Sequence, residues 1–254
     1  MDFAVETLLF LFFAAAVAGF MDTLAGGGGL ITIPALVVSG VPPLAALGTN
    51  KLQSSFGSGT ASFLLFKRKK IHWQELRPMM VAAFIGSIMG TVIVQLIDAK
   101  VLGFIIPLVL VIIAVYFITA PYLKIESSAA RMSDKTYQKT VLPVIGIYDG
   151  MFGPGTGSFL AVAGVSLRGL ELIKATAIAK PLNFATNIAS LIVFVFAGQI
   201  IWLAGVAMIV GQILGAWLGS HYLFKVNPKV LRILIVTICL IMLGQYWYRQ
   251  FAAQ

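Results

Sequence analysis

The sequence predicts an all-α polytopic membrane protein made of two repeats. Hydrophobic residues occupy 59% of its 254 positions, charged residues occupy only 11%, and the mean hydropathy is +0.98. A soluble domain carries charges at about a quarter of its positions. The apolar residues also gather in long runs, and one motif of aspartate followed by glycines occurs twice. Together these observations predict that each repeat contains four long helices and a short segment that follows a glycine break.

The apolar runs identify the expected helices. A membrane-spanning helix needs roughly 20 residues, and the shorter runs reach this length through flanking small or polar residues. The first run follows acidic residues and no basic one, so we expect a retained helix rather than a cleaved signal peptide. In chain order the runs cover residues 4–21, 52–66, 79–97, 101–121, 184–198, 200–223 and 230–247.

The two halves of the chain match each other at a spacing of 129 positions, which pairs Lys51 with Lys180. Such coincidences at one spacing indicate a duplication. We therefore predict a first membrane repeat at residues 1–122, a central cytoplasmic loop at 123–140 and a second membrane repeat at 141–254. The same spacing also pairs Ile71 with Ile200, Trp73 with Trp202, Gly86 with Gly215 and Gly90 with Gly219.

Two orientations of the repeats fit these runs. Re-entrant glycine breaks would give four crossings in each half and parallel repeats, whereas full crossings would give five and inverted repeats. Cytoplasmic loops carry an excess of Lys and Arg. The inverted arrangement places fourteen of the sixteen cations at helix ends or in loops on the cytoplasmic side, and the parallel arrangement places ten. We therefore predict inverted repeats with both termini outside.

The glycine breaks are the first candidate part of a binding site. Backbone groups that leave a helix inside a membrane must be satisfied by protein or by water in a cavity. We predict unwound hinges whose bare N–H groups face an anion, followed by half-helices whose positive ends point at it. The alternative is close helix packing, which is our interpretation of the Gly86 and Gly90 pair and of the Gly215 and Gly219 pair. The predicted substrate-binding residues of the breaks are Gly26, Gly27, Gly28, Gly29, Gly153, Gly155, Thr156 and Gly157.

Two lysines are the second candidate part of the site. Lys51 and Lys180 lie about eight residues into their expected helices, about 12 Å below the membrane surface at ~1.5 Å per residue. In the inverted arrangement they approach the midplane from opposite faces. A charge at this depth is costly and usually functional, and the alternative is a side chain that extends back to the surface. Neighbouring polar residues predicted to bind substrate with them are Thr49, Asn50, Asn183 and Asn187.

Asp22 and Asp149 are the other charges expected inside the membrane. They could neutralise the two lysines. They could instead be protonated, which would leave the lysines free for an anion and couple transport to protons. A third role is capping, because the broken backbone that follows each aspartate needs an acceptor for its N–H groups. The sequence leaves these roles open.

The sequence argues against several other classes of protein. Cys239 is the single cysteine, which rules out an intramolecular disulfide and a cysteine-rich metal site. His72 and His221 have no carboxylates at ligand spacing, so we expect no metal and no cofactor. We also expect no enzyme, because the membrane segments offer only two aspartates as acid–base groups, and no phosphate-loop motif is present. The net charge of +9 includes four cations at 67–70 that directly follow an apolar run. This position indicates a cytoplasmic loop rather than nucleic-acid binding.

Several of these motifs resemble one known family. They are residues 18–22, 26–34, 49–51 and 153–159, together with Lys180 and Asn183. The motifs are similar to those of the sulfite exporter TauE/SafE family, also called the toluene-sulfonate uptake permease family, and the resemblance covers essentially the whole chain. It implies a prokaryotic or plant membrane protein that moves sulfite, sulfoacetate, other organosulfonates or related small anions.

We therefore expect a secondary transporter of small sulfur-containing anions, such as sulfite or organosulfonates, in a prokaryotic inner (plasma) membrane. Export is the easier direction, because a potential of 100 mV, negative inside, drives each negative charge outward with about 2.3 kcal/mol. The alternatives are an anion channel and a carrier of another small organic anion such as a carboxylate. The expected partners are the anion and the lipid bilayer, and a homodimer is an alternative to the monomer.

Overall fold

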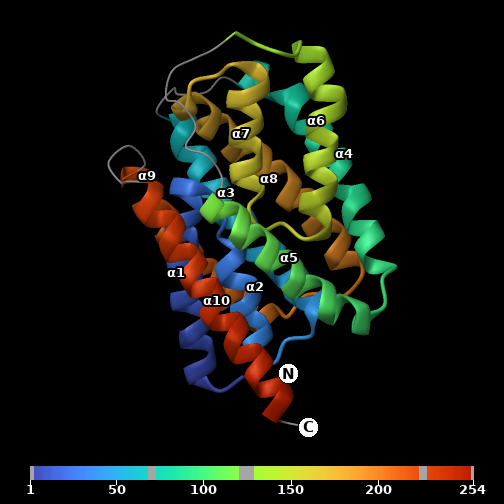
Figure 1. Ribbon diagram of the computed structural model, residues 1–254, viewed down its shortest axis with the longest axis vertical. Coiled ribbons are helices and arrows are strands. Elements are labelled where there is room, and N and C mark those ends of the chain that lie inside the picture. The colour runs from blue at the N-terminus through green and yellow to red at the C-terminus, as the bar shows by residue number, and fades with distance from the viewer. Residues whose placement is uncertain (1–2, 68–72, 120–128, 223–227, 253–254) are drawn as a thin grey trace.

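The protein is an all-helical bundle (Figure 1). The computed structural model describes residues 3–67, 73–119, 129–222 and 228–252, and these ranges contain ten α-helices and no β-strand. This confirms the predicted fold class. The first half contains α1 (Val5–Ala25), α2 (Gly29–Val38), α3 (Pro43–Lys67), α4 (Trp73–Gln95) and α5 (Ala99–Thr119). The second half contains α6 (Asp134–Met151), α7 (Thr156–Arg168), α8 (Leu172–Phe196), α9 (Trp202–Tyr222) and α10 (Pro228–Ala252).

Each half contains one short helix among four long ones, at the same place in the order. The second helix of each half is short, with 10 residues in α2 and 13 in α7, and each begins directly after a glycine break. The other eight helices have between 18 and 25 residues. By length and apolar composition, α1, α4, α5, α8 and α9 are each able to cross a membrane. The chain is therefore a multi-pass membrane protein.

The polar segment between the halves is partly helical. α6 begins at Asp134, and the hydroxyl of Ser133 caps it by accepting a hydrogen bond from the N–H of Thr136 at 3.2 Å. Asp134 also forms an ion pair with Arg168 at the end of α7. The last seven residues of the loop expected at 123–140 are thus in a helix, because a serine cap starts it in this segment. Residues 123–128 lie outside the described part of the chain.

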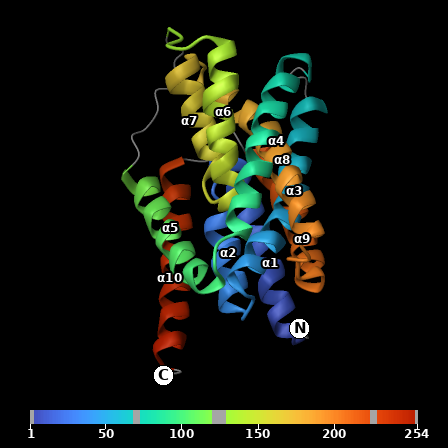
Figure 2. The same ribbon diagram turned by 90° about the vertical axis from the view of Figure 1, so that its right-hand side faces the viewer.

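Long helices of one half pack against long helices of the other. α1 lies along α9, and α6 lies along α4 (Figure 2). The backbones approach closely where glycines leave room: a Cβ at Gly90 would lie 2.0 Å from the carbonyl oxygen of Ile147, and a Cβ at Gly215 would lie 2.0 Å from that of Ala16. These glycines therefore serve close helix packing, as predicted.

α3 and α8 connect the halves and carry the two lysines. The two helices contact each other, and each also contacts a long helix of the other half, α9 for α3 and α4 for α8. As a result Lys51 and Lys180 are buried, each with 1% of its surface exposed. Packing between the halves thus places both lysines in the interior of the protein.

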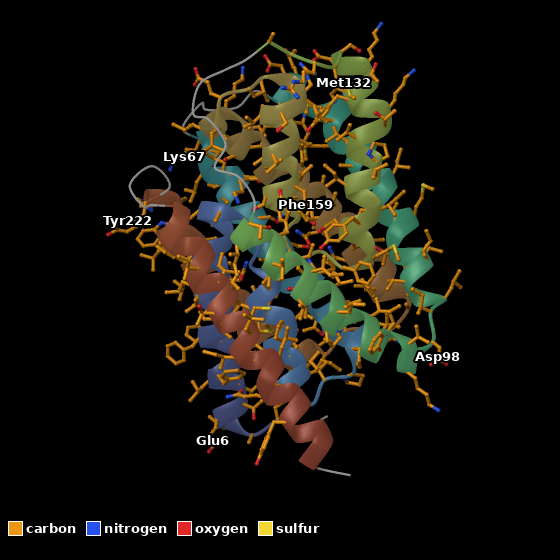
Figure 3. The ribbon with its side chains drawn as sticks, in the orientation of Figure 1. Glu6, Lys67, Asp98, Met132, Phe159 and Tyr222 are labelled. Carbon is orange, nitrogen blue, oxygen red and sulfur yellow. The ribbon has the colours of Figure 1, made fainter. Side chains whose placement is uncertain are left out.

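The ends of the helices separate into two groups. Glu6 and Asp98 lie at the lower end of the molecule in Figure 3, whereas Lys67, Met132 and Tyr222 lie toward the upper end. The start of α1 and the end of α10 also lie at the lower end (Figures 1 and 2). The first turn of α1 and the last turn of α10 therefore lie on the side opposite Lys67.

Candidate functional site

The first glycine break is closed by the aspartate that precedes it. Gly26 and Gly27 have φ of 70° and 116°, conformations that glycine adopts without the steric cost of a Cβ. The chain therefore turns back on itself, and Oδ1 of Asp22 accepts hydrogen bonds from the N–H groups of Gly27 at 3.0 Å and Gly28 at 3.2 Å. Asp22 thus caps α2, one of its three predicted roles. These two N–H groups are not bare, in contrast to our expectation, because the carboxylate satisfies them.

The second glycine break is organised differently. Gly153 and Gly155 have φ of 95° and 82°. Oδ1 of Asp149 accepts a hydrogen bond from the hydroxyl of Thr156 at 2.7 Å instead of from the backbone. Among the described residues, the N–H groups of Gly157 and Ser158 in the first turn of α7 donate to no acceptor. The N-terminus of α7 therefore keeps the free donors that the sequence predicted, whereas the N-terminus of α2 is capped by a carboxylate.

Lys51 crosses from the first half to the break of the second half. Its Nζ lies 2.9 Å from Oδ2 of Asp149, and both residues are almost fully buried. The orientation of the two groups does not allow a well-formed hydrogen bond between these atoms. A Cβ at Gly153 would lie 2.9 Å from Nζ of Lys51, so the end of the lysine packs directly against this glycine. In this conformation Asp149 neutralises Lys51, another of the three predicted roles of the aspartates.

Lys180 makes the reciprocal contact with the first half. Its Nζ donates a hydrogen bond to the backbone carbonyl of Asp22, and no carboxylate within the described ranges forms an ion pair with it. A Cβ at Gly157 would lie 3.8 Å from this Nζ, so Lys180 stands beside the N-terminus of α7. The buried ammonium group of Lys180 therefore lies next to the free N–H donors.

The two breaks also touch each other. The hydroxyl of Ser158 donates a hydrogen bond to the carbonyl of Ala25. A Cβ at Gly26 would lie 2.6 Å from the backbone nitrogen of Ser158, and a Cβ at Gly29 would lie 3.2 Å from Cα of Pro154. Both breaks and both lysines therefore form one cluster, as the sequence predicted.

Asparagine side chains extend this cluster along α3 and α8. Oδ1 of Asn50 accepts hydrogen bonds from the hydroxyl of Thr32 in α2 at 2.6 Å and from Nε2 of Gln53 at 2.8 Å. On α8, Nδ2 of Asn187 donates to the backbone carbonyl of Asn183 at 2.8 Å. All of these side chains are buried. Asn50 thus joins α2 to α3, and Asn183 and Asn187, four positions apart, lie on one face of α8.

Thr49 is a predicted site residue whose side chain makes its hydrogen bond away from the two glycine breaks. Its hydroxyl accepts a hydrogen bond from the N–H of Ile201 at 3.0 Å, just before α9. Positions two apart on a helix point in different directions. Thr49 therefore faces the start of α9, whereas Lys51 faces the second glycine break. In this structure Thr49 joins helices.

Three polar residues near the breaks were missed by our predicted set of site residues. Thr32 binds Asn50, Ser158 binds Ala25, and the hydroxyl of Tyr148 donates to the carbonyl of Pro154 at 2.5 Å. Their signal is their position, since Tyr148 directly precedes the second aspartate, Ser158 directly follows the second glycine run and Thr32 closely follows the first. The sequence alone does not show that their side chains turn inward.

The described part of the chain contains no group of three His, Cys, Asp or Glu side chains that could hold a metal ion. His221 lies at the end of α9, where its Nδ1 is 2.8 Å from the carbonyl oxygen of Trp217, and His72 lies outside the described residues. The cluster contains two ammonium groups, backbone N–H donors and amides, which are groups able to bind an anion, together with the carboxylates of Asp22 and Asp149.

A multi-pass helical protein with two broken helices that meet beside buried charges has the architecture of a secondary membrane transporter. Comparison with known proteins agrees with this class and identifies the family within it. The family model described as "Sulfite exporter TauE/SafE" matches residues 11–246, and the chain belongs to this family. No solved structure matches the chain significantly.

Its relatives among bacterial proteins are all named as transporters. The probable membrane transporter protein ORF9 of Sinorhizobium sp is 42% identical over 93% of this chain and 91% of its own length. A probable membrane transporter protein of Haemophilus influenzae is 40% identical over 98% of both chains. The probable membrane transporter protein YfcA of Escherichia coli is 42% identical over 97% of this chain and 92% of its own length. The protein is thus a membrane transporter, in agreement with the expectation that it is not an enzyme.

Proposed function

We propose that this transporter moves small sulfur-containing oxyanions, such as sulfite or organosulfonates, and that it works as an exporter by alternating access. The observation that carries the proposal is the position of Lys180 beside the N-terminus of α7. A buried ammonium group and free N–H donors at a helix N-terminus together favour an anion with several acceptor oxygens. The name of the family supports sulfite and related anions as the chemical class.

The direction of transport follows from charge. An anion that leaves the cell moves down a membrane potential that is negative inside, with about 2.3 kcal/mol per charge and 100 mV. Export therefore needs no coupled ion. The burial of both lysines supports alternating access, because helices must move before an anion can enter or leave.

We also propose that the two halves are inverted repeats. The placement of Lys67, Met132 and Tyr222 opposite Glu6 and Asp98 supports this arrangement. In this arrangement the end of the molecule that carries Lys67 faces the cytoplasm, since the sequence has four cations at residues 67–70. In this arrangement the two breaks reach the cluster from opposite sides of the membrane.

Reconstituted protein tests the proposed function. We expect sulfite efflux from proteoliposomes to saturate and to be stimulated by sulfite on the other side, which an open channel would not show. Lys180→Met should abolish this flux, and Lys51→Met should reduce it at least tenfold. Lys67→Met is the matched control, because Lys67 lies exposed in the last turn of α3 and should leave the flux unchanged.

Two results of these flux measurements would contradict the proposed function. Full flux in both lysine variants would contradict the assignment of the site. A carboxylate such as acetate that is transported in place of sulfite would contradict the proposed substrate class. Size-exclusion profiles of the purified variants show whether a lost flux reflects a lost fold.

A further inference from the structure

One aromatic ring lies against both glycine breaks. It belongs to Phe117 near the end of α5, and this side chain is buried with 2% of its surface exposed. A Cβ at Gly27 would lie 2.9 Å from Cζ of the ring, and a Cβ at Gly155 would lie 3.2 Å from its Cε2. Both glycines have a positive φ, so the ring touches the two places where the helices are broken. Phe117 therefore covers the contact between the breaks from the side of α5.

The course of α5 brings this ring to the depth of the lysine cluster. α5 rises from the end of the molecule that carries Asp98 and ends about midway along it, near Phe159 (Figures 1 and 3). The centroid of the Tyr116 ring lies 5.1 Å from that of Phe159 in the first turn of α7. The end of α5 thus lies beside the N-terminus of α7, where Lys180 also lies. The ring of Phe117 is therefore in the same layer of the protein as the proposed anion site.

Filling of space is the simpler explanation for a ring that packs against glycines, and two observations go beyond it. The ring spans two breaks from different halves of the chain instead of packing against one. It also belongs to a peripheral helix, since α5 packs mainly on α10 and α3 and lies beside α10 at one side of the bundle (Figure 2). The close helix pairs, α1 with α9 and α4 with α6, do not include α5. The end of α5 can therefore move away from the breaks while these pairs stay intact.

We infer that Phe117 is the gate of the anion site, and that its ring must leave the two breaks before an anion can reach Lys180. The inference rests on the proposed function, since a gate acts only where an anion passes. An apolar ring excludes water from the cluster, and an apolar constriction without water blocks a hydrated anion. Movement of the end of α5 opens this constriction, and return of the ring closes the cluster again. Such opening and closing of a buried site is what alternating access requires.

Thiol labelling of Ser158→Cys in the detergent-purified protein tests the gate without any transport. Ser158 is buried at the contact between the breaks, where its hydroxyl donates to the carbonyl of Ala25. The probe is sulfonatoethyl methanethiosulfonate, a small anionic thiol reagent, and Cys239→Ser removes the native cysteine. We expect Phe117→Ala to raise the labelling rate of Ser158→Cys at least tenfold. Phe104→Ala is the matched control, because Phe104 lies in the same helix with 72% of its surface exposed and should leave the rate unchanged.

The native Cys239 separates a gate from general packing, because it is buried in the same apolar core as Phe117. Its labelling rate in the Phe117→Ala variant without other changes should stay as low as in the wild type. Equal gains at Cys239 and at Ser158→Cys would show a general loosening of the core and overturn the inference. If Phe117→Ala does not fold, Phe117→Leu keeps an apolar side chain and should still raise the labelling of Ser158→Cys at least threefold. An unchanged rate in a folded variant would overturn the gate and leave the proposed function standing, whereas absence of sulfite flux in the wild type would contradict the proposed function.

Discussion

Gly26 is the residue on which the contact between the two breaks depends most directly. It combines a φ of 70° with a backbone position against α7. A side chain here would meet both a conformational cost and a collision. The collision is with the backbone of Gly157 and Ser158, which cannot rotate away as a flexible side chain could.

Gly26→Ala should therefore abolish sulfite flux and lower the melting temperature of the purified protein. Gly198→Ala is the matched control, since Gly198 has a φ of 66° and no heavy atom lies within 4 Å of the position that a Cβ would take there. Gly198→Ala places an alanine at a positive φ without a collision, whereas Gly26→Ala adds a collision with α7 at φ 70° and ψ 150°, a combination that essentially only glycine adopts. Equal flux and equal melting temperatures of the two variants would show that the contact with α7 is unimportant.

The sequence predicted most members of the site but not their separate roles. Two aspartates, two lysines and two glycine runs were identifiable because charges are rare inside apolar segments and closely spaced glycines there mark a break in a helix. Their pairing was not, because it depends on which half each lysine reaches. Asp22 is a cap and Asp149 an ion-pair partner because the backbone turns differently at Gly27 and Gly155. Thr49 binds the N–H of Ile201 rather than lying beside Lys51, since positions two apart on a helix do not share a face.

At the scale of helices, the contacts of α1 with α9 and of α6 with α4 fix how the halves fit together. Glycine at positions 90 and 215 lets the backbones meet, and the occurrence of each in a pair of glycines four residues apart predicted this role. The apolar runs predicted where most of the long helices lie but not their lengths, since α3 and α8 extend well before the runs at 52–66 and 184–198. The partner of each helix was not, because an apolar face indicates burial without identifying the surface that covers it.

Gly90→Ala and Gly215→Ala should destabilise the protein to a similar extent, by about 1 to 3 kcal/mol, which is typical of overpacking a close contact. Each added methyl group would lie 2.0 Å from a carbonyl oxygen of the partner helix, so the helices must separate. Gly103→Ala in α5 is the control, because no heavy atom lies within 4 Å of its Cβ position. Unfolding in increasing concentrations of denaturing detergent measures the difference, and a control as unstable as the two variants would refute the packing argument.

At the scale of the whole molecule, the two groups of helix ends predict which positions face which side of the membrane. Cys239 is buried, so it should not react with an impermeant thiol reagent in the native protein. Single cysteines at exposed ends of helices can then report on topology with little background.

Glu6→Cys and Asp98→Cys should react with an impermeant maleimide added outside intact cells, whereas Tyr222→Cys should react only after the membrane is opened. All three positions are exposed, and the first two lie at the end of the molecule opposite the third. Labelling of Tyr222→Cys from outside together with Glu6→Cys would contradict inverted repeats. The labelling pattern should stay the same in the Lys180→Met variant, since that change affects the site and not the insertion.

The reciprocal contacts of the lysines have a consequence for the origin of the protein. Lys51 of the first half meets the break of the second, and Lys180 of the second half meets the break of the first. Neither half alone contains both partners of either contact, so neither half alone could assemble the proposed anion site. An ancestor with a single repeat would have needed two copies of itself, and gene fusion would have made that partnership permanent. Co-expression of the two halves as separate chains should accordingly rebuild a working transporter, whereas either half alone should not.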